Sequence, residues 1–151
     1  MKLLKNISYL LFIALFLNGC DSDDTDPGAQ LIGAWNWESS TYSYTYGDEP
    51  ETETDYASDQ NSWVITFNDD NTFSEVRVSE LDDDDNYTGS GTWSADGEIL
   101  TITFDDDDSY ELNVDYALSN ESNRLTLTIL HNYDGYSTVE VHVMNRVVDE
   151  E

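Results

Sequence analysis

Apolar and polar residues alternate with a period of two over most of the chain after residue 30. This period puts successive side chains on opposite faces of an extended strand, whereas a helix repeats every 3.6 residues. In the clearest stretch, Leu112 and Val114 alternate with Glu111 and Asn113. The pattern therefore predicts an all-β protein.

Clusters of Asn, Asp, Gly and Ser interrupt the alternation and predict turns. Because the links are short, we expect about eight antiparallel strands. The Tyr-rich stretch Thr41–Tyr46 either extends the first strand or forms a short extra one. The expected strands are Leu31–Trp37, Ser62–Phe67, Thr72–Ser79, Tyr87–Trp93, Glu98–Phe104, Ser109–Leu118, Arg124–His131 and Tyr136–Val148.

Two architectures suit eight sequential strands. Closure into an up-and-down antiparallel β-barrel removes the exposed edges, and a barrel of about eight strands encloses one small ligand. A sandwich of two sheets is the competing solution, and the local pattern does not choose between them. Gly89 and Gly91 predict a bulge or bend within their strand.

The start of the β region resembles a known family. Leu31–Trp35 reads Leu-Ile-Gly-Ala-Trp and matches the Gly-x-Trp opening of lipocalins, and more specifically the lipocalin-like domain of bacterial lipoproteins. Three further stretches are similar to that family in order and spacing: Ile65–Phe73, Gly91–Gly97 and Leu100–Phe104.

The resemblance covers residues 31–148 and implies a small lipocalin-like β-barrel with a central cavity. In lipocalins an arginine from the end of the barrel covers the tryptophan of the Gly-x-Trp motif. The resemblance therefore implies a structural motif of Gly33, Trp35 and Arg146, in which a cation–π contact contributes about 0.5–2 kcal/mol.

The first nineteen residues predict a lipoprotein signal peptide. Lys2 and Lys5 precede the apolar run Ile7–Leu17, which is too short for a comfortable membrane span. Leu17–Cys20 reads Leu-Asn-Gly-Cys and resembles the lipobox of bacterial lipoproteins, whose cysteine becomes the lipidated first residue. The competing interpretation is an ordinary signal peptide with a chance cysteine.

Lipidation of Cys20, by palmitate or a similar acyl chain, would anchor the protein in the cell envelope, and we expect the outer membrane. Residues 20–30 then form a flexible acidic tether, since Asp21–Gly28 contains no apolar residue. This stretch is either a surface-export signal or a plain spacer.

The charge balance excludes several classes of partner. The chain has 33 acidic residues against 5 basic ones and a net charge of −28. We expect no nucleic acid partner, because nucleic-acid binders need a basic face. Aromatic residues make up 13% of the chain, which predicts a packed core rather than disorder. A single cysteine excludes an internal disulfide, and we expect a monomer.

Two aspartate runs, Asp82–Asp85 and Asp105–Asp108, fall in loops that an up-and-down topology puts at one end of the barrel. Three interpretations stay open for this acidic rim: solubility, weak Ca²⁺ binding, and selection of cationic or neutral ligands over anionic ones. The candidate Ca²⁺ ligands are Asp82, Asp84, Asp105 and Asp107, and no other cofactor is expected. His131 and His142 are expected about 20 Å apart along their hairpin, too far to share an ion.

Aromatic residues are the remaining functional clue. They either line a pocket or simply fill the barrel. No serine hydrolase, zinc protease or P-loop motif occurs, so the chain is not expected to be an enzyme. Two functions follow: non-catalytic binding of a small apolar or amphipathic ligand, or a structural or adhesive envelope module with a filled barrel whose acidic rim binds Ca²⁺ or a partner. The candidate ligand-binding residues are Trp37, Tyr42, Tyr44, Tyr46 and Trp63.

Overall fold

The computed structural model describes residue 26 and residues 28–46, 49–79, 86–105, 110–133 and 136–148. The predicted signal peptide, Cys20 and most of the tether lie outside these residues. No helix in the described ranges is long and apolar enough to cross a membrane. The strands are β1 (Gly33–Tyr46), β2 (Glu49–Tyr56), β3 (Asn61–Phe67), β4 (Thr72–Ser79), β5 (Tyr87–Asp96), β6 (Ile99–Phe104), β7 (Glu111–Ser119), β8 (Arg124–Tyr133) and β9 (Tyr136–Arg146).

Strand β1 closes the barrel. Its residues 33–36 pair with β3 on one side, and residues 35–46 pair with β9 on the other. From β3 to β9 each strand pairs with the next one along the chain, always antiparallel. The predicted eight-stranded antiparallel barrel is therefore confirmed. The sandwich alternative is wrong. In two separate sheets β1 and β9 would not pair with each other, whereas here they do.

A ninth strand lies outside this cylinder. Residues 39–46 of β1 pair with β2, so Thr41–Tyr46 extends the first strand rather than forming a separate one. The sequence pattern predicts no strand at residues 49–56, and this is wrong. Glutamate and threonine alternate there with a period of two, which suits an edge strand. Because the segment is highly charged, it resembles a solvent-exposed loop.

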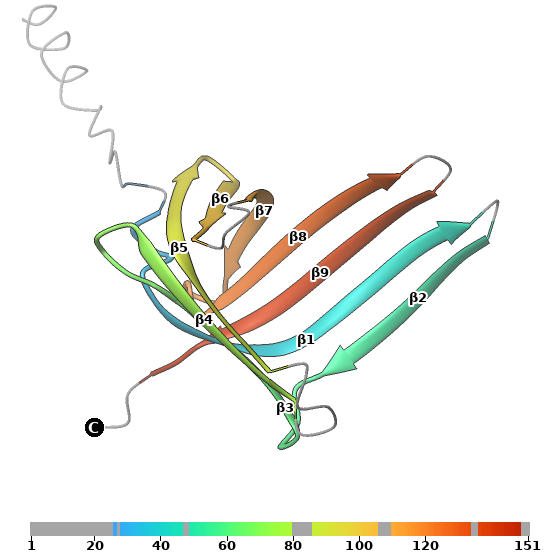
Figure 1. Cartoon of the computed structure of the whole chain (residues 1–151), viewed down its shortest axis with the longest axis horizontal. Coiled ribbons are helices and arrows are strands. Elements are labelled where there is room, and N and C mark those ends of the chain that lie inside the picture. The colour runs from blue at the N-terminus through green and yellow to red at the C-terminus, as the bar shows by residue number, and fades with distance from the viewer. Residues whose placement is uncertain are drawn as a thin grey trace, which may run out of the picture.

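Strands β8, β9, β1 and β2 continue side by side beyond the curled part of the sheet (Figure 1). Strand β7 pairs with β8 only through residues 124–128, whereas β8 and β9 pair as far as Tyr133 and Tyr136. We call this four-stranded continuation the extension. One face of the extension carries Ser40, Tyr42 and His142. The strand register shows that this face is continuous with the barrel interior.

Large apolar side chains fill the end of the barrel opposite the extension. Each contributes roughly 1.5–3 kcal/mol through removal of its surface from water. The largest that are fully buried are Trp35, Phe67, Phe73, Leu31, Ile65, Leu100, Leu125, Met144 and Val114.

The Gly-x-Trp motif seals this filled end. The Trp35 indole donates a 2.8 Å hydrogen bond to the carbonyl oxygen of Leu31, and the Arg146 guanidinium lies 4.3 Å from the Trp35 ring centre. Gly33 has φ +124°, and a Cβ there would lie 2.9 Å from Arg146 Nη1. A side chain at position 33 would therefore push the arginine away from the tryptophan.

A bulge or bend is expected at Gly89 and Gly91, and the bulge is absent, because β5 pairs without a register shift with both β4 and β6. The shift lies instead in β1, between Trp37 and Ser39. Gly91 serves close packing, because a Cβ there would overlap the carbonyl oxygen of Thr103.

Candidate functional site

Two adjoining pockets lie where the closed barrel meets the extension. An open pocket of about 310 Å³ lies at the rim, and a more enclosed pocket of about 130 Å³ lies deeper in the barrel. They share Tyr42, Trp63, Arg77 and His142, so the two pockets adjoin at these side chains. The remaining lining of the open pocket is Trp37, Ser40, Asp55, Asn61, Ser62, Val78 and Ser79.

The enclosed pocket is mainly apolar. Strands β6, β7 and β8 supply branched aliphatic side chains and one phenylalanine, while β4 and β9 each supply a glutamate, Glu75 and Glu140. An apolar cavity with a few polar groups is the usual form of a small-molecule site. The apolar lining is Ile65, Ile102, Phe104, Leu112, Val114, Leu127 and Ile129.

Glu75 forms the first polar cluster with Trp63 and Arg77. The Trp63 indole and Arg77 Nη2 donate to Glu75 Oε2 over 2.8 and 3.2 Å. The Arg77 guanidinium also lies 4.2 Å from the Trp63 ring centre. The Glu75 side chain is 2% exposed, and its buried Oε1 atom has no hydrogen-bond partner in the described part of the chain. An unpaired buried acceptor costs about 1–3 kcal/mol.

Ser40 links a second cluster. Its hydroxyl accepts a 2.8 Å hydrogen bond from the Trp37 indole, which can only donate, and lies 2.6 Å from His142 Nδ1. Burial lowers the pKa of His142 below its usual 6.5 and outweighs Glu140, which raises it. The imidazole is therefore neutral at pH 7.

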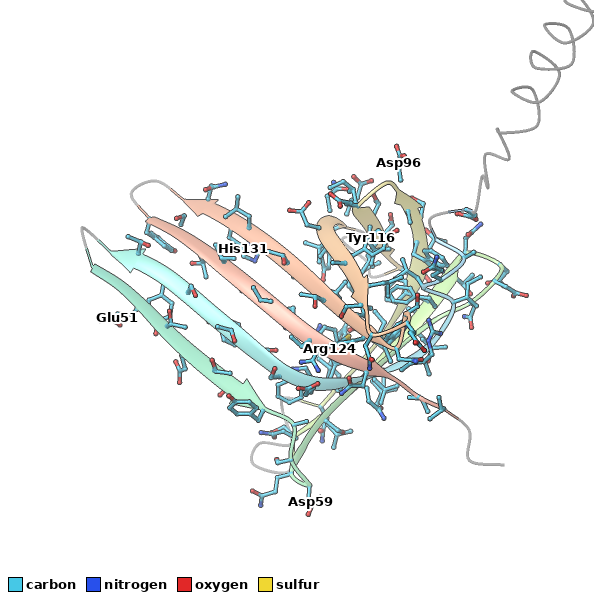
Figure 2. The ribbon with its side chains drawn as sticks, turned by 180° about the vertical axis from the view of Figure 1, so that it is seen from behind. Glu51, Asp59, Asp96, Tyr116, Arg124 and His131 are labelled. Atoms are coloured by element: carbon cyan, nitrogen blue, oxygen red, sulfur yellow. The ribbon has the colours of Figure 1, made fainter. Side chains whose placement is uncertain are left out.

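Glu140 lies between the two histidines on the inner face of the extension. Its carboxylate oxygens are each 3.5 Å from a ring nitrogen, one of His131 and one of His142. The expected separation of the histidines is therefore wrong. The hairpin register pairs His131 with Thr138, four residues rather than six from His142. Figure 2 labels His131 on β8, with Glu51 across the extension on β2.

Two carboxylates act on Tyr42, which lines both pockets. Burial raises the pKa of the Tyr42 hydroxyl, and the charges of Glu140 and Asp55 raise it further. Ser40 and Arg77 oppose this effect. The site thus combines aromatic surface with carboxylates.

Three of the five aromatic candidates, Trp37, Tyr42 and Trp63, line these pockets. Tyr44 lies farther along the same face of β1 and lines neither pocket. Tyr46 ends β1, and its side chain lies outside the described residues.

Sequence reasoning missed Glu75, Arg77 and His142 as pocket residues. The signal in β4 is the period of two: Glu75 and Arg77 share a face with Phe73, which is buried. Val76 and Val78 draw attention to the opposite face, but they are 46% and 41% exposed. The more apolar face of this strand thus points to solvent.

Three of the candidate Ca²⁺ ligands, Asp82, Asp84 and Asp107, lie outside the described residues. Asp105 is exposed, and its carboxylate accepts a 3.3 Å hydrogen bond from the Ser90 hydroxyl. Within the described ranges no three His, Cys, Asp or Glu residues are grouped so that they could hold a metal ion. The Ca²⁺ hypothesis therefore stays a prediction.

Comparison with known proteins identifies one matching family model. The model of the lipocalin-like domain matches residues 31–128. No curated protein matches the chain. Among solved structures the chain is similar to the isotype 1 transferrin binding protein B from serogroup B Neisseria meningitidis, with 7% sequence identity and a TM-score of 0.47. That match covers 78% of this chain and 25% of the other.

Proposed function

The chain belongs to the lipocalin-like domain family, and from this premise we propose that its barrel binds a small apolar or amphipathic molecule without chemical conversion. The observation that carries the proposal is the open pocket of about 310 Å³, which adjoins the enclosed apolar pocket. Small-molecule sites in proteins occupy about 300–1,000 Å³. A barrel serving only as a rigid module would be filled by side chains at both ends.

The shape of the site favours a ligand that is apolar at one end. The enclosed pocket presents Leu112, Val114 and Leu127, while the open pocket presents polar atoms of Ser40, Asn61 and Ser79. A ligand with an apolar body in the enclosed pocket and a polar group directed towards the open pocket matches this change from apolar to polar lining. Burial of the apolar body contributes about 25 cal/mol per Å².

A fluorescent dye tests the proposal. N-phenyl-1-naphthylamine is neutral and apolar, and its emission rises when it leaves water. Ser79 lines the open pocket, so Ser79→Trp should obstruct the entrance and weaken dye binding about tenfold, or about 1.4 kcal/mol. Ser74, on the same strand, is exposed and lines neither pocket, so Ser74→Trp should change the affinity less than twofold. Equal effects of both variants would contradict binding in the pocket.

The second candidate is a structural or adhesive module whose acidic rim binds Ca²⁺ or a partner. The filled half of the barrel and the acidic edge strand β2 favour it. Ca²⁺ at about 100 times its Kd would raise the free energy of unfolding by about 2.7 kcal/mol. Such stabilisation, together with failure of the dye to bind, would favour this function over ligand binding.

The proposal includes a lipid anchor on Cys20, which would hold the domain at the cell envelope, and at the outer membrane in particular. Its support is the sequence Leu17–Cys20 after the apolar run Ile7–Leu17. The acidic segment after Cys20 would act as a spacer between membrane and barrel.

A further inference from the structure

Glu75 brings a carboxylate into an interior that is otherwise mainly apolar. Trp63 and Arg77 both donate to its Oε2 atom. Its Oε1 atom is buried and receives no hydrogen bond from any residue that the structure describes. Buried polar atoms in proteins nearly always have a partner, so this oxygen has an acceptor position free for a donor from a ligand.

The carboxylate with this unpaired oxygen belongs to the enclosed pocket. Glu75 lines that pocket together with Ile102, Leu112 and Ile129. Tyr42, Trp63 and Arg77 line both pockets, and two of them, Trp63 and Arg77, hold the carboxylate, so Glu75 lies next to the place where the pockets adjoin. Because Oε1 is buried, the carboxyl group has to turn for this atom to meet a donor from a ligand.

The charge of the pocket lining selects against anions. Asp55, Glu75 and Glu140 carry carboxylates, and Arg77 is the one lysine or arginine that lines either pocket in the described part of the chain. The Arg77 guanidinium is already engaged by the Trp63 ring and by Glu75. A ligand anion would have to displace it while lying next to a buried carboxylate.

Resting on the proposed binding function, we infer that the pocket takes an amphipathic cation, whose primary ammonium group donates to Glu75 Oε1 and whose short apolar body packs against Ile102, Leu112 and Ile129. An ammonium group carries three donors and no acceptor, which suits a site with a free carboxylate oxygen. The rings of Tyr42 and Trp63 line the route and attract a cation through their π faces.

Three eight-carbon probes distinguish the contribution of the head-group charge to binding from that of the apolar body. They are octylammonium, octanol and octanoate, titrated into the full chain at pH 7 by calorimetry. Octylammonium should bind about tenfold more tightly than octanol, and octanoate most weakly. Glu75→Gln should weaken octylammonium binding about tenfold and leave octanol binding within about twofold.

Glu98→Gln is the matched control, because Glu98 is exposed at the β5–β6 hairpin and the substitution removes the same charge. It should leave the order of the three probes unchanged. If Glu75→Gln does not fold, the wild-type chain still gives a test. The Trp63 indole N–H resonance, assigned with Trp63→Phe, should shift on addition of octylammonium and move much less with octanol.

The outcomes distinguish the two proposals. Binding of octanol with no preference for octylammonium, or an unchanged preference in Glu75→Gln, would overturn the cation inference and leave the binding function standing. Failure of all three probes and of the neutral dye would overturn the binding function, and the cation inference with it.

Discussion

The side chain of Arg146 joins the last strand to the segment that precedes the first. Its Nη1 atom donates to the carbonyl oxygen of Ile32 over 2.8 Å, and its guanidinium lies 4.3 Å from the Trp35 ring centre. It also donates to the carbonyl oxygens of Gln30 and Ser122. One side chain thus connects the start of β1, the β7–β8 turn and the end of β9 where the barrel is sealed.

Arg146→Ala should lower the free energy of unfolding by about 2–4 kcal/mol, because three hydrogen bonds and a cation–π contact are lost together. Urea denaturation measures the change. Arg124→Ala is the control, since Arg124 pairs with Glu38 at 2.9 Å with both side chains more than a third exposed. Such a surface pair contributes about 0–1 kcal/mol. A similar loss in both variants would refute a sealing role for Arg146.

Stability should decrease as the pH falls from 7.5 towards 5.5, because His142 is held neutral by burial. Its pKa in the folded state is lowered from 6.5, so in this range the unfolded chain binds more protons than the folded one. The free energy of unfolding therefore rises with pH between the folded-state pKa and about pH 6.5. Above and below this range the contribution of the histidine to the free energy of unfolding is almost independent of pH.

Urea midpoints measured across this range test the histidine effect. His142→Asn should flatten the slope, since an asparagine does not titrate. His131→Asn is the matched control and should leave the His142 contribution in place. An unchanged slope in His142→Asn would assign the pH dependence to other groups.

Gly91→Ala should destabilise the barrel by more than about 3 kcal/mol, because the new methyl group would overlap the carbonyl oxygen of Thr103 and approach Phe73 Cε1 within 2.8 Å. Gly97→Ala provides the comparison. Gly97 has φ +61° but open space around it, so alanine there should cost only about 1 kcal/mol. Denaturation of both variants under one condition ranks them, and the reverse order would contradict the close approach of β5 and β6.

Cys20→Ser should release the protein from membranes, because Cys20 is the only cysteine and the predicted acylation site. Membrane fractionation together with labelling by an alkynyl palmitate analogue measures both effects. Ser22→Ala, two residues away, should remain labelled and membrane-bound. Retention of the label in Cys20→Ser would exclude the predicted anchor.

Residue pattern alone was sufficient for most strands. The segments Ser62–Phe67 and Thr72–Ser79 match β3 and β4 closely, because regular alternation and Asn-Asp turns are local properties. The Gly-x-Trp resemblance implied the contact between Trp35 and Arg146, which the structure contains. The edge strand β2 was missed, because its glutamates look like a solvated loop and its pairing to β1 depends on the neighbouring strand.

The pocket was predicted only in part. Trp37, Tyr42 and Trp63 are large aromatic residues on predicted strands, so composition and period pointed to them. Glu75 did not stand out, since a glutamate in an alternating strand is normally assigned to the solvent face. Its inward position follows from Phe73 and Ile65, which fix the register of β4 against β3.

The sequence by itself therefore determined the β class, the antiparallel order of neighbouring strands and the turns between them, because these depend on residues close together in the chain. Only the tertiary structure decided how β1 and β9 close the barrel, which face of β4 points inward, and how Glu140 comes to lie between His131 and His142. The physical reason is that a period of two specifies only which side chains share a face. Which face is buried depends on packing between strands far apart in sequence.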